Sequence, residues 1–193
     1  NLIKRFAACA SEIIILKRDD DDLTLKKSLS RADIIINLAG SPILQRWNKE
    51  NKKTILESRV LTTRRIVSTL NELPETTEKK LLISASATGI YPDDRFSQYD
   101  EFSSAKASGF LAEVVSKWEA EADNLINPSV RLIIVRFGVV LAKDGGLLKS
   151  LIPVYKLGLG GVMGTGKQLT CFIHLEDVFN AMMFFIKNQN TSG

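Results

Sequence analysis

Two kinds of segment alternate along this chain, and the alternation limits the folds that it can adopt. Short runs rich in β-branched residues are apolar on both faces, and longer stretches between them place apolar residues three and four positions apart. The first pattern predicts strands buried in a parallel sheet, and the second predicts helices that cover the sheet. The sequence therefore predicts an α/β fold of the doubly wound kind, with helices on both faces. The predicted strands are 12–17, 33–38, 80–84, 131–136 and 169–173, and the predicted helices are 2–9, 48–73, 110–125, 147–157 and 176–187.

The length and composition suit one ordinary domain. The chain has 193 residues, of which 45% are hydrophobic and 25% are charged. This balance excludes a disordered chain and a small disulfide scaffold. Neither a repeat nor a low-complexity tract nor a proline-rich linker interrupts the chain. We therefore expect a single domain over residues 1–193.

The apolar runs are too short to span a membrane. Residues 13–16 and 34–36 form runs of strand length, whereas a spanning helix needs roughly 20 apolar residues. The first six residues lack the order of basic, apolar and small residues that marks a secretory signal, and the two cysteines, Cys9 and Cys171, cannot form a disulfide framework. We expect a reduced, cytoplasmic protein with no membrane partner.

The charge pattern gives little reason to expect nucleic acid as a partner. The formal net charge is +4, but basic residues are spread among acidic ones and aromatic residues make up only 7% of the chain. Nucleic-acid-binding domains usually gather their basic residues on one face. We expect a small-molecule substrate and no nucleic-acid partner, and we keep a homodimer open as the assembly.

The residues that follow the predicted strands indicate where a ligand would bind. In doubly wound sheets, ligands lie outside the carboxyl ends of the strands. Lys17 and Arg18 follow the first predicted strand, Ala39 and Gly40 follow the second, and residues 84–89 close the third. Small and hydroxyl residues dominate the last two sets, which lets a flat ligand approach the backbone closely. A cofactor cleft fits this arrangement.

Eight short motifs occur in order over nearly the whole chain, and together they carry a resemblance. The motifs are Asn37-Leu38-Ala39-Gly40, Arg46-Trp47-Asn48, Ser58-Arg59 with Thr62-Thr63, Ser86-Ala87-Thr88-Gly89-Ile90-Tyr91, Lys117-Trp118-Glu119, Arg136-Phe137-Gly138-Val139-Val140-Leu141, Leu157-Gly158-Leu159-Gly160-Gly161 and Ile173-His174-Leu175-Glu176-Asp177. The chain resembles the atypical extended short-chain dehydrogenase/reductases of the NAD-dependent epimerase/dehydratase family, in the branch that includes plant and bacterial proteins linked by name to cell division. The resemblance implies a Rossmann-type sheet and a nicotinamide dinucleotide cofactor. It also implies the chemistry of an oxidoreductase or a nucleotide-sugar epimerase.

Two parts of the family pattern have no counterpart here. Members usually begin with a strand and a glycine-rich turn that cradles pyrophosphate, and residues 1–6 look like the helix that follows that turn. The family's substrate-covering region would continue beyond Gly193. We therefore expect a Rossmann-type domain, truncated at both ends, that lacks its first strand and its C-terminal substrate region.

The resemblance also indicates which dinucleotide is bound. Arg18 ends the first predicted strand, where a carboxylate would accept the ribose hydroxyls of NAD and a cation would meet the 2′-phosphate of NADP. Lys17 and Arg18 therefore favour NADP(H) over NAD(H), although without the resemblance a solvated strand end would be the simpler interpretation. For Arg59 the alternative is an exposed helical arginine. The expected cofactor-binding residues are Lys17, Arg18, Leu38, Ala39, Gly40, Thr54, Arg59, Ser84 and Leu141.

The catalytic residues of the family are only partly represented. Ser86 looks like the family's serine, able to hydrogen-bond a substrate oxygen, but counting back from Glu119 puts Val115 and Leu111 where lysine and tyrosine belong. A tyrosine that acts as a base near pH 7 needs roughly 4 kcal/mol of help, mainly from such a cation. The standard proton relay is therefore absent. Tyr91 is the nearest phenol that could replace it, with a packed loop tyrosine as the alternative.

Other interpretations of the sequence stay open. Without tyrosine and lysine, the chain could be a dinucleotide-binding regulator with no turnover. Residues 161–167 match the G-x4-G-K phosphate loop of nucleoside triphosphatases, but Gln168 replaces the magnesium-binding hydroxyl and a strand-like stretch follows where a helix should begin. His174, the only histidine, fits a structural hydrogen-bonding role better than an acid or base.

Overall fold

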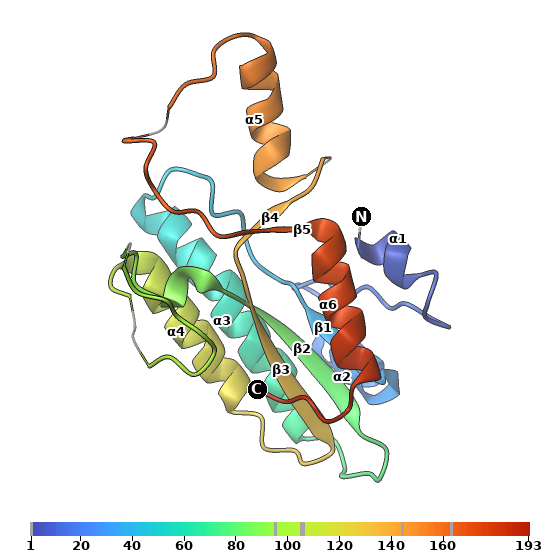
Figure 1. The fold of residues 1–193 in the computed structure, drawn as a ribbon. Helices are drawn as coiled ribbons and strands as arrows, with labels where there is room; N and C mark the ends of the chain where they lie inside the picture. Colours follow the sequence, from blue (N-terminus) through green and yellow to red (C-terminus); the bar gives the residue numbers. More distant parts are fainter. Residues whose placement is uncertain (1, 95, 105–106, 144, 163) are drawn as a thin grey trace.

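A computed structural model describes residues 2–94, 96–104, 107–143, 145–162 and 164–193. The described residues contain two parallel sheets and the helices around them (Figure 1). The strands are β1 (Ile34–Asn37), β2 (Lys80–Ala87), β3 (Val130–Phe137), β4 (Val139–Leu141) and β5 (Phe172–His174). The helices are α1 (Leu2–Phe6), α2 (Asp22–Arg31), α3 (Lys49–Asn71), the 3₁₀ turn η1 (Thr88–Ile90), α4 (Phe110–Asp123), α5 (Gly146–Lys156) and α6 (Leu175–Lys187).

The main sheet has the order β1-β2-β3, and all three strands are parallel. Its two faces are covered by different helices, as Figure 1 shows with α3 and α4 on one side and α6 and α1 on the other. Leu82 of β2 packs with α2 and α3, whereas its neighbours Leu81 and Ile83 pack with α6. This alternation follows from the period of two in a strand and makes both faces apolar. The predicted doubly wound α/β fold is confirmed.

The smaller sheet pairs β4 with β5 directly beyond the end of β3. The chain turns there at Gly138, where an added Cβ would lie only 2.5 Å from the carbonyl oxygen of Cys171. The neighbouring amide of Val139 donates to that same oxygen at 2.8 Å. Glycine is therefore required for this approach of two backbones.

The first of the predicted strands, 12–17, does not form. Ile15, within it, leaves 62% of its surface exposed. Among the described residues, no backbone ladder joins this segment to the free edge of β1. An apolar run forms a strand only when a neighbouring strand takes its hydrogen bonds. The fifth predicted strand, 169–173, forms only over its last residues, as part of β5.

Helix α2 was not predicted, because only two of its side chains, Leu25 and Leu29, are buried. Asp21 caps it by accepting from the backbone nitrogen of Thr24 at 2.8 Å. The five predicted helices all form, close to the expected bounds. None of the described helices is long and apolar enough to cross a bilayer.

Candidate functional site

The carboxyl ends of β1, β2 and β3 meet at one edge of the main sheet, because the three strands are parallel. This is the edge at which the sequence predicts a ligand. Three segments come together there: the chain that leaves β1, the turn η1 that leaves β2, and the end of β3 beside α4.

The chain that leaves β1 is fixed from beneath by a buried hydroxyl. Thr63 of α3 is fully buried, and its Oγ1 accepts from Nδ2 of Asn37 at 2.8 Å and from Nε1 of Trp118 at 2.9 Å. The side-chain oxygen of Asn37 in turn accepts from the backbone nitrogen of Ala39 at 3.2 Å. The end of β1 is thereby tied to both α3 and α4. Leu38, at this end, is 46% exposed, so the backbone beside it lies at the surface.

Arg59 lies one helical turn before Thr63 on α3 and supports the same segment after β1. Its Nη1 donates to the carbonyl oxygens of Ser41 and Ile55, both at 3.1 Å, and its guanidinium lies over the Trp118 ring at 5.4 Å. Gly40 passes so close that an added Cβ would lie 2.8 Å from Cζ of Arg59. Burial lowers the pKa of Arg59 below its usual value. The alternative of an exposed arginine is wrong, because Arg59 is only 9% exposed and supports the loop from inside.

Two hydroxyls predicted at the end of β2 are buried on the side of α3 and α4. Ser84 is 1% exposed, and its Oγ is the only buried side-chain oxygen or nitrogen without a hydrogen-bond partner among the described residues. Ser86 is also buried, and its hydroxyl donates to the carboxylate of Glu119 on α4. Ser86 therefore lies at the predicted place, but its proton is directed into the protein.

Glu119 is part of a larger charged group that we call the inner network, consisting of Ser86, Tyr91, Glu119 and Arg136. Arg136 is the register partner of Ser86 on β3. Its Nε and Nη2 each donate to one oxygen of Glu119 at 2.8 Å, and its Nη1 donates to the hydroxyl of Tyr91 at 2.7 Å. Hydrogen bonding to the Glu119 carboxylate raises the pKa of Arg136. The inner network therefore fixes a cation against a phenol at the carboxyl edge.

The phenol of Tyr91 has a second partner in the segment that follows η1. Its hydroxyl donates to the backbone oxygen of Asp100 at 2.9 Å, and its ring stacks on that of Tyr99 at 5.6 Å between centroids. Tyr99 donates a hydrogen bond to Asp94, and this bond is the main reason that the pKa of Asp94 falls to about 2. Tyr91 is thus oriented from both sides.

The family's usual tyrosine and lysine have no equivalent on α4. Val115, at the expected lysine position, is 4% exposed and belongs to the apolar interior. Leu111 stands at the expected tyrosine position one turn earlier. In this part of the structure, Arg136 is the cation that contacts a phenol.

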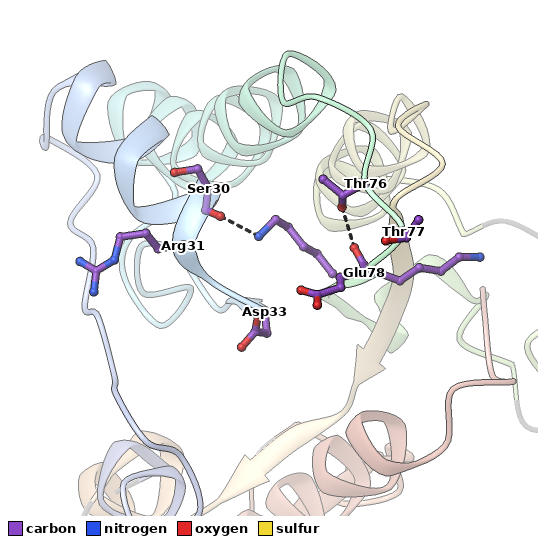
Figure 2. A pocket seen from close by; sticks show the side chains of 8 residues that line it. Ser30, Arg31, Asp33, Thr76, Thr77 and Glu78 are labelled. Atoms are coloured by element: carbon purple, nitrogen blue, oxygen red, sulfur yellow. Dashed lines mark hydrogen bonds between the residues drawn. The ribbon is translucent and has the colours of Figure 1, made fainter.

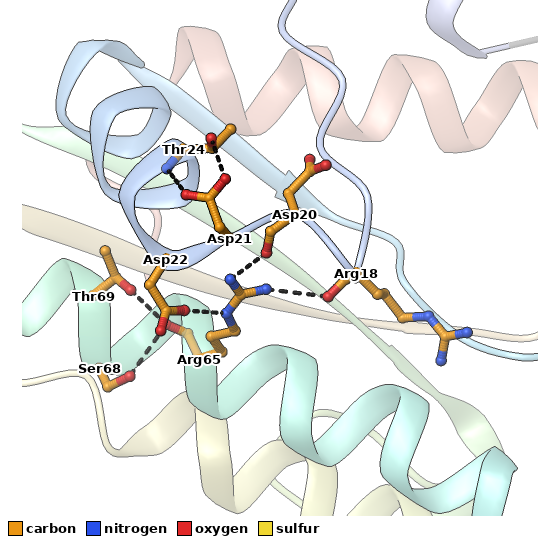
Figure 3. Close-up of polar contacts among 8 residues, drawn as sticks. All are labelled: Arg18, Asp20, Asp21, Asp22, Thr24, Arg65, Ser68 and Thr69. Carbon is orange, nitrogen blue, oxygen red and sulfur yellow. Dashed lines mark hydrogen bonds and ion pairs between the residues drawn. The ribbon is translucent and has the colours of Figure 1, made fainter.

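The basic residues predicted at the adenosine end lie in a surface turn and not at the end of a strand. Lys17, Arg18 and Asp19 line a shallow hollow there. The turn is held by Arg65 of α3, whose Nε donates to Oδ1 of Asp22 at 2.7 Å and whose Nη1 donates to the carbonyl oxygen of Arg18 at 3.1 Å. Nη2 donates to the carbonyl oxygen of Asp20. We call Arg65 with these three partners the outer clamp (Figure 3).

The remaining predicted residues, Thr54, Leu141 and His174, make contacts within the helices and strands that carry them. Thr54 donates back to the carbonyl oxygen of Glu50 at 3.0 Å, and Leu141 pairs with His174 between β4 and β5. His174 caps α6, with its Nδ1 accepting from the backbone nitrogen of Glu176 at 3.3 Å, which is the structural role expected of it.

The phosphate-loop alternative is not supported by the chain around it. Met163 lies outside the described residues, but residues 164–171 form turns and coil, and β5 follows them where a helix would be needed. The described residues also hold no group of three or more His, Cys, Asp or Glu side chains placed to bind a metal.

A second hollow lies at the opposite, amino-terminal end of the strands (Figure 2). It is lined by Ser30, Arg31, Asp33, Thr76, Thr77, Glu78, Lys79 and Lys80. Nζ of Lys80 donates to the carbonyl oxygens of Ser30 and Ala32 at 2.8 and 2.7 Å, so this cation satisfies the last carbonyls of α2. The polar groups of this hollow therefore serve the fold.

Sequence reasoning missed Glu119, Arg136 and Arg65 as members of these clusters. The sequence held a signal for the first two, since Glu119 follows a tryptophan within a half-apolar helix and Arg136 follows the apolar run 132–135 near the end of a strand. Charged residues at buried positions are almost always paired. No comparable signal existed for Arg65, because it lies on a helix rich in basic residues.

Comparisons with known proteins agree with the fold. Residues 4–193 match the NAD dependent epimerase/dehydratase family. An epimerase family protein of Staphylococcus aureus strain N315 is 38% identical over 163 residues, which cover 83% of this chain and 53% of the relative. The chain thus spans about half the length of the curated relatives it matches.

Two solved structures are similar in shape as well as in sequence. Human epimerase family protein SDR39U1, isoform 2, solved with NADPH, is 29% identical with a TM-score of 0.88, and the match covers 100% of this chain and 67% of the human one. A nucleoside-diphosphate sugar epimerase from Corynebacterium glutamicum is 31% identical with a TM-score of 0.70, covering 87% of this chain and 34% of that one.

Proposed function

Because the chain belongs to the NAD-dependent epimerase/dehydratase family, we propose that it binds NADP(H) in preference to NAD(H) and acts on a small carbonyl or alcohol substrate. The observation that carries this proposal is the similarity to the human relative solved with NADPH, which extends over the whole chain. The reaction would be an oxidoreduction or an epimerisation of the kind named for the sugar epimerase relative.

The residues at the carboxyl edge fit a dinucleotide. The backbone of Leu38 to Gly40 borders the surface and is held rigidly by Thr63 and Arg59, so a flat ring could lie against it without displacing side chains. Lys17 and Arg18 supply positive charge for a 2′-phosphate. NADPH, when bound, supplies a hydride to a carbonyl carbon.

The proton for such a reduction would come from Tyr91, whose hydroxyl would exchange its hydrogen bond to the backbone oxygen of Asp100 for one to the substrate oxygen. The Tyr91 hydroxyl contacts Nη1 of Arg136, and the arginine would face the negative charge left on the phenol oxygen after the proton moves to the substrate oxygen. Glu119 holds the other two guanidinium nitrogens and so keeps Arg136 pointed at Tyr91. Ser86 contributes by hydrogen-bonding Glu119.

A second candidate is a dinucleotide-binding regulator that does not turn over. The buried Val115 at the expected lysine position favours it, because an apolar interior residue cannot assist a proton transfer. Both candidates predict that NADPH binds. They differ only in whether carbonyl compounds are reduced.

The test titrates the full-length protein with NADPH, NADH and ATP, and follows nicotinamide absorbance with a panel of aldehydes, ketones and nucleotide sugars. We expect tighter binding of NADPH than of NADH and oxidation of NADPH by at least one compound. Binding without turnover on the panel would favour the regulator. Preference for ATP would overturn both candidates.

Tyr91→Phe is the variant that tests the proton donor. It keeps the ring and its stacking on Tyr99 but removes the hydroxyl, so we expect turnover to fall by roughly 10²- to 10⁴-fold while NADPH affinity stays the same. Tyr99→Phe is the matched control, since it removes a hydroxyl from the neighbouring ring. Equal turnover in the two variants would assign the proton donor elsewhere.

A further inference from the structure

We propose that Arg65 is a positioning residue for the choice of cofactor, because it holds the backbone of Arg18 where that side chain can meet the 2′-phosphate of NADP(H). This inference rests on the proposed function, since it concerns the same dinucleotide. Arg65 does not touch the cofactor in this proposal. It acts through the turn that carries Arg18.

Each of the three guanidinium nitrogens of Arg65 has a partner on the turn or at the start of α2. These partners are the carbonyl oxygens of Arg18 and Asp20 and the carboxylate of Asp22. The Arg65 side chain is 30% exposed, whereas that of its partner Asp22 is 88% exposed. Figure 3 shows the guanidinium enclosed by these partners, between α3 and the start of α2. A planar group with five donors suits such a fork, and a lysine ammonium does not reproduce it.

Apart from the outer clamp, the turn is supported by its neighbour Leu16, which packs against the apolar cluster that α2 and α3 share. Within the described residues, the backbone bonds of the turn itself are local, from Asp20 to Lys17 at 3.3 Å and from Leu25 to Asp21 at 3.0 Å. The side chain of Asp20 accepts from the backbone nitrogen of Lys17 at 2.8 Å, which is also local. Because no strand ladder fixes residues 12–17, the outer clamp supplies the hydrogen bonds that fix the backbone of the turn to α3.

Arg18 uses only its backbone in the clamp and keeps its side chain available. In Figure 3 the Arg18 side chain extends away from Arg65 and from the aspartates that follow it. The same side chain lines the hollow shared with Lys17 and Asp19. A guanidinium presented in this way binds a phosphate in a bidentate manner. The outer clamp therefore fixes the position of the Arg18 backbone, from which the Arg18 guanidinium extends.

The ratio of NADPH affinity to NADH affinity distinguishes a positioning role of Arg65 from a general role in the stability of the fold. NADPH and NADH differ only in the 2′-phosphate, so a change in their affinity ratio reports on contacts to that group, while a general loosening of the fold lowers both affinities alike. Losing a charge-assisted contact at Arg18 should cost roughly ten- to a hundredfold in NADPH affinity. Losing only the positioning of Arg18 should lower NADPH affinity less, by about three- to tenfold.

The experiment measures dissociation constants for NADPH and NADH with the full-length wild-type protein and with Arg65→Met, Arg65→Lys, Arg18→Ala and the double variant Arg18→Ala/Arg65→Met. Arg64→Met is the matched control, because Arg64 lies beside Arg65 on α3 but pairs with Glu121 of α4 at 2.6 Å. Thermal unfolding of each variant shows whether it folds. If Arg65→Met does not fold, Arg65→Lys and Asp22→Asn carry the test.

We expect Arg65→Met to weaken NADPH about three- to tenfold with NADH unchanged, and Arg64→Met to leave both unchanged. In the Arg18→Ala background, Arg65→Met should have no further effect on the ratio. Equal weakening of both dinucleotides by Arg65→Met would overturn the inference. A further loss of NADPH affinity in the double variant would also overturn it, since Arg65 would then bind the phosphate itself. Failure of the wild type to bind either dinucleotide would instead refute the proposed function.

Discussion

The inner network and the outer clamp both depend on an arginine of similar exposure, 28% for Arg136 and 30% for Arg65, but they give it different partners. Arg136 lies on β3, and its chief partner is Glu119 of α4, a carboxylate that is only 11% exposed. The charged partner of Arg65 is Asp22, which is 88% exposed, and its other two partners are backbone carbonyl oxygens. The first arrangement fixes charges inside the protein. The second fixes a turn on its outside.

This difference in partners indicates which of the two clusters contributes more to the stability of the fold. A buried carboxylate that loses its cation keeps the desolvation cost without the compensating contact, whereas a surface contact that is lost is largely replaced by water. The inner network should therefore govern stability. The outer clamp should govern ligand preference with little effect on stability.

The largest expected effect breaks the inner network. Arg136→Met leaves Glu119 buried without its cation and with only the hydrogen bond from Ser86, so the free energy of unfolding should fall by about 3 kcal/mol, measured by urea denaturation. The double variant Arg136→Met/Glu119→Leu should regain much of this loss, because it removes the unpaired charge. A single variant as stable as the wild type would mean that the pair contributes nothing to the fold.

A smaller effect is expected just beyond the network, where β3 continues into β4. Gly138→Ala would push a Cβ to 2.5 Å from the carbonyl oxygen of Cys171, and relieving that overlap should lower the free energy of unfolding by about 2 kcal/mol. Gly145→Ala is the control, because an added Cβ there meets nothing within 4 Å. Similar urea midpoints for the two variants would contradict the close approach seen at Gly138.

The smallest effect concerns the partly exposed carboxylate of Asp94. Its pKa is lowered to about 2, chiefly by the hydrogen bond from Tyr99, so its contribution to stability is present above the usual value of 3.8 and is lost as pH falls through 2. A carboxyl titration followed by NMR should find the midpoint near 2. Tyr99→Phe should move this midpoint back toward 3.8. A wild-type midpoint at or above 3.8 would refute the assignment.

The sequence predicted the parts of the fold whose pattern is local. The strands at β1, β2 and β3 and the five helices follow from runs and spacings that a short window contains. Residues 12–17 failed because a strand also needs a neighbour, and neighbours are decided by the whole sheet. Helix α2 was missed because its local pattern is weak: only two leucines are buried among polar residues.

Two residues of the candidate site were predicted from the sequence, but the partners that hold them were not. The carboxyl edge, Ser86 and Tyr91 were placed from the order of motifs along the chain, and the structure brings both residues into one network. Their partners Glu119 and Arg136 are 33 and 45 residues away from them in the chain, respectively. Pairings over such separations depend on the register of strands and helices, which a pattern of single residues does not contain.

The hydroxyl oxygen of Thr63 limits which residue types this position can accept. This oxygen receives two hydrogen bonds, from side chains on β1 and α4, and lies on a third element, α3. Valine would match the shape of threonine yet offer no lone pairs, so an amide and an indole would both be stranded in an apolar interior. Only serine keeps the acceptor at similar size, and it gives up a methyl group. Relatives that lack a hydroxyl here must therefore have changed Asn37 and Trp118 as well, and the three positions should vary together.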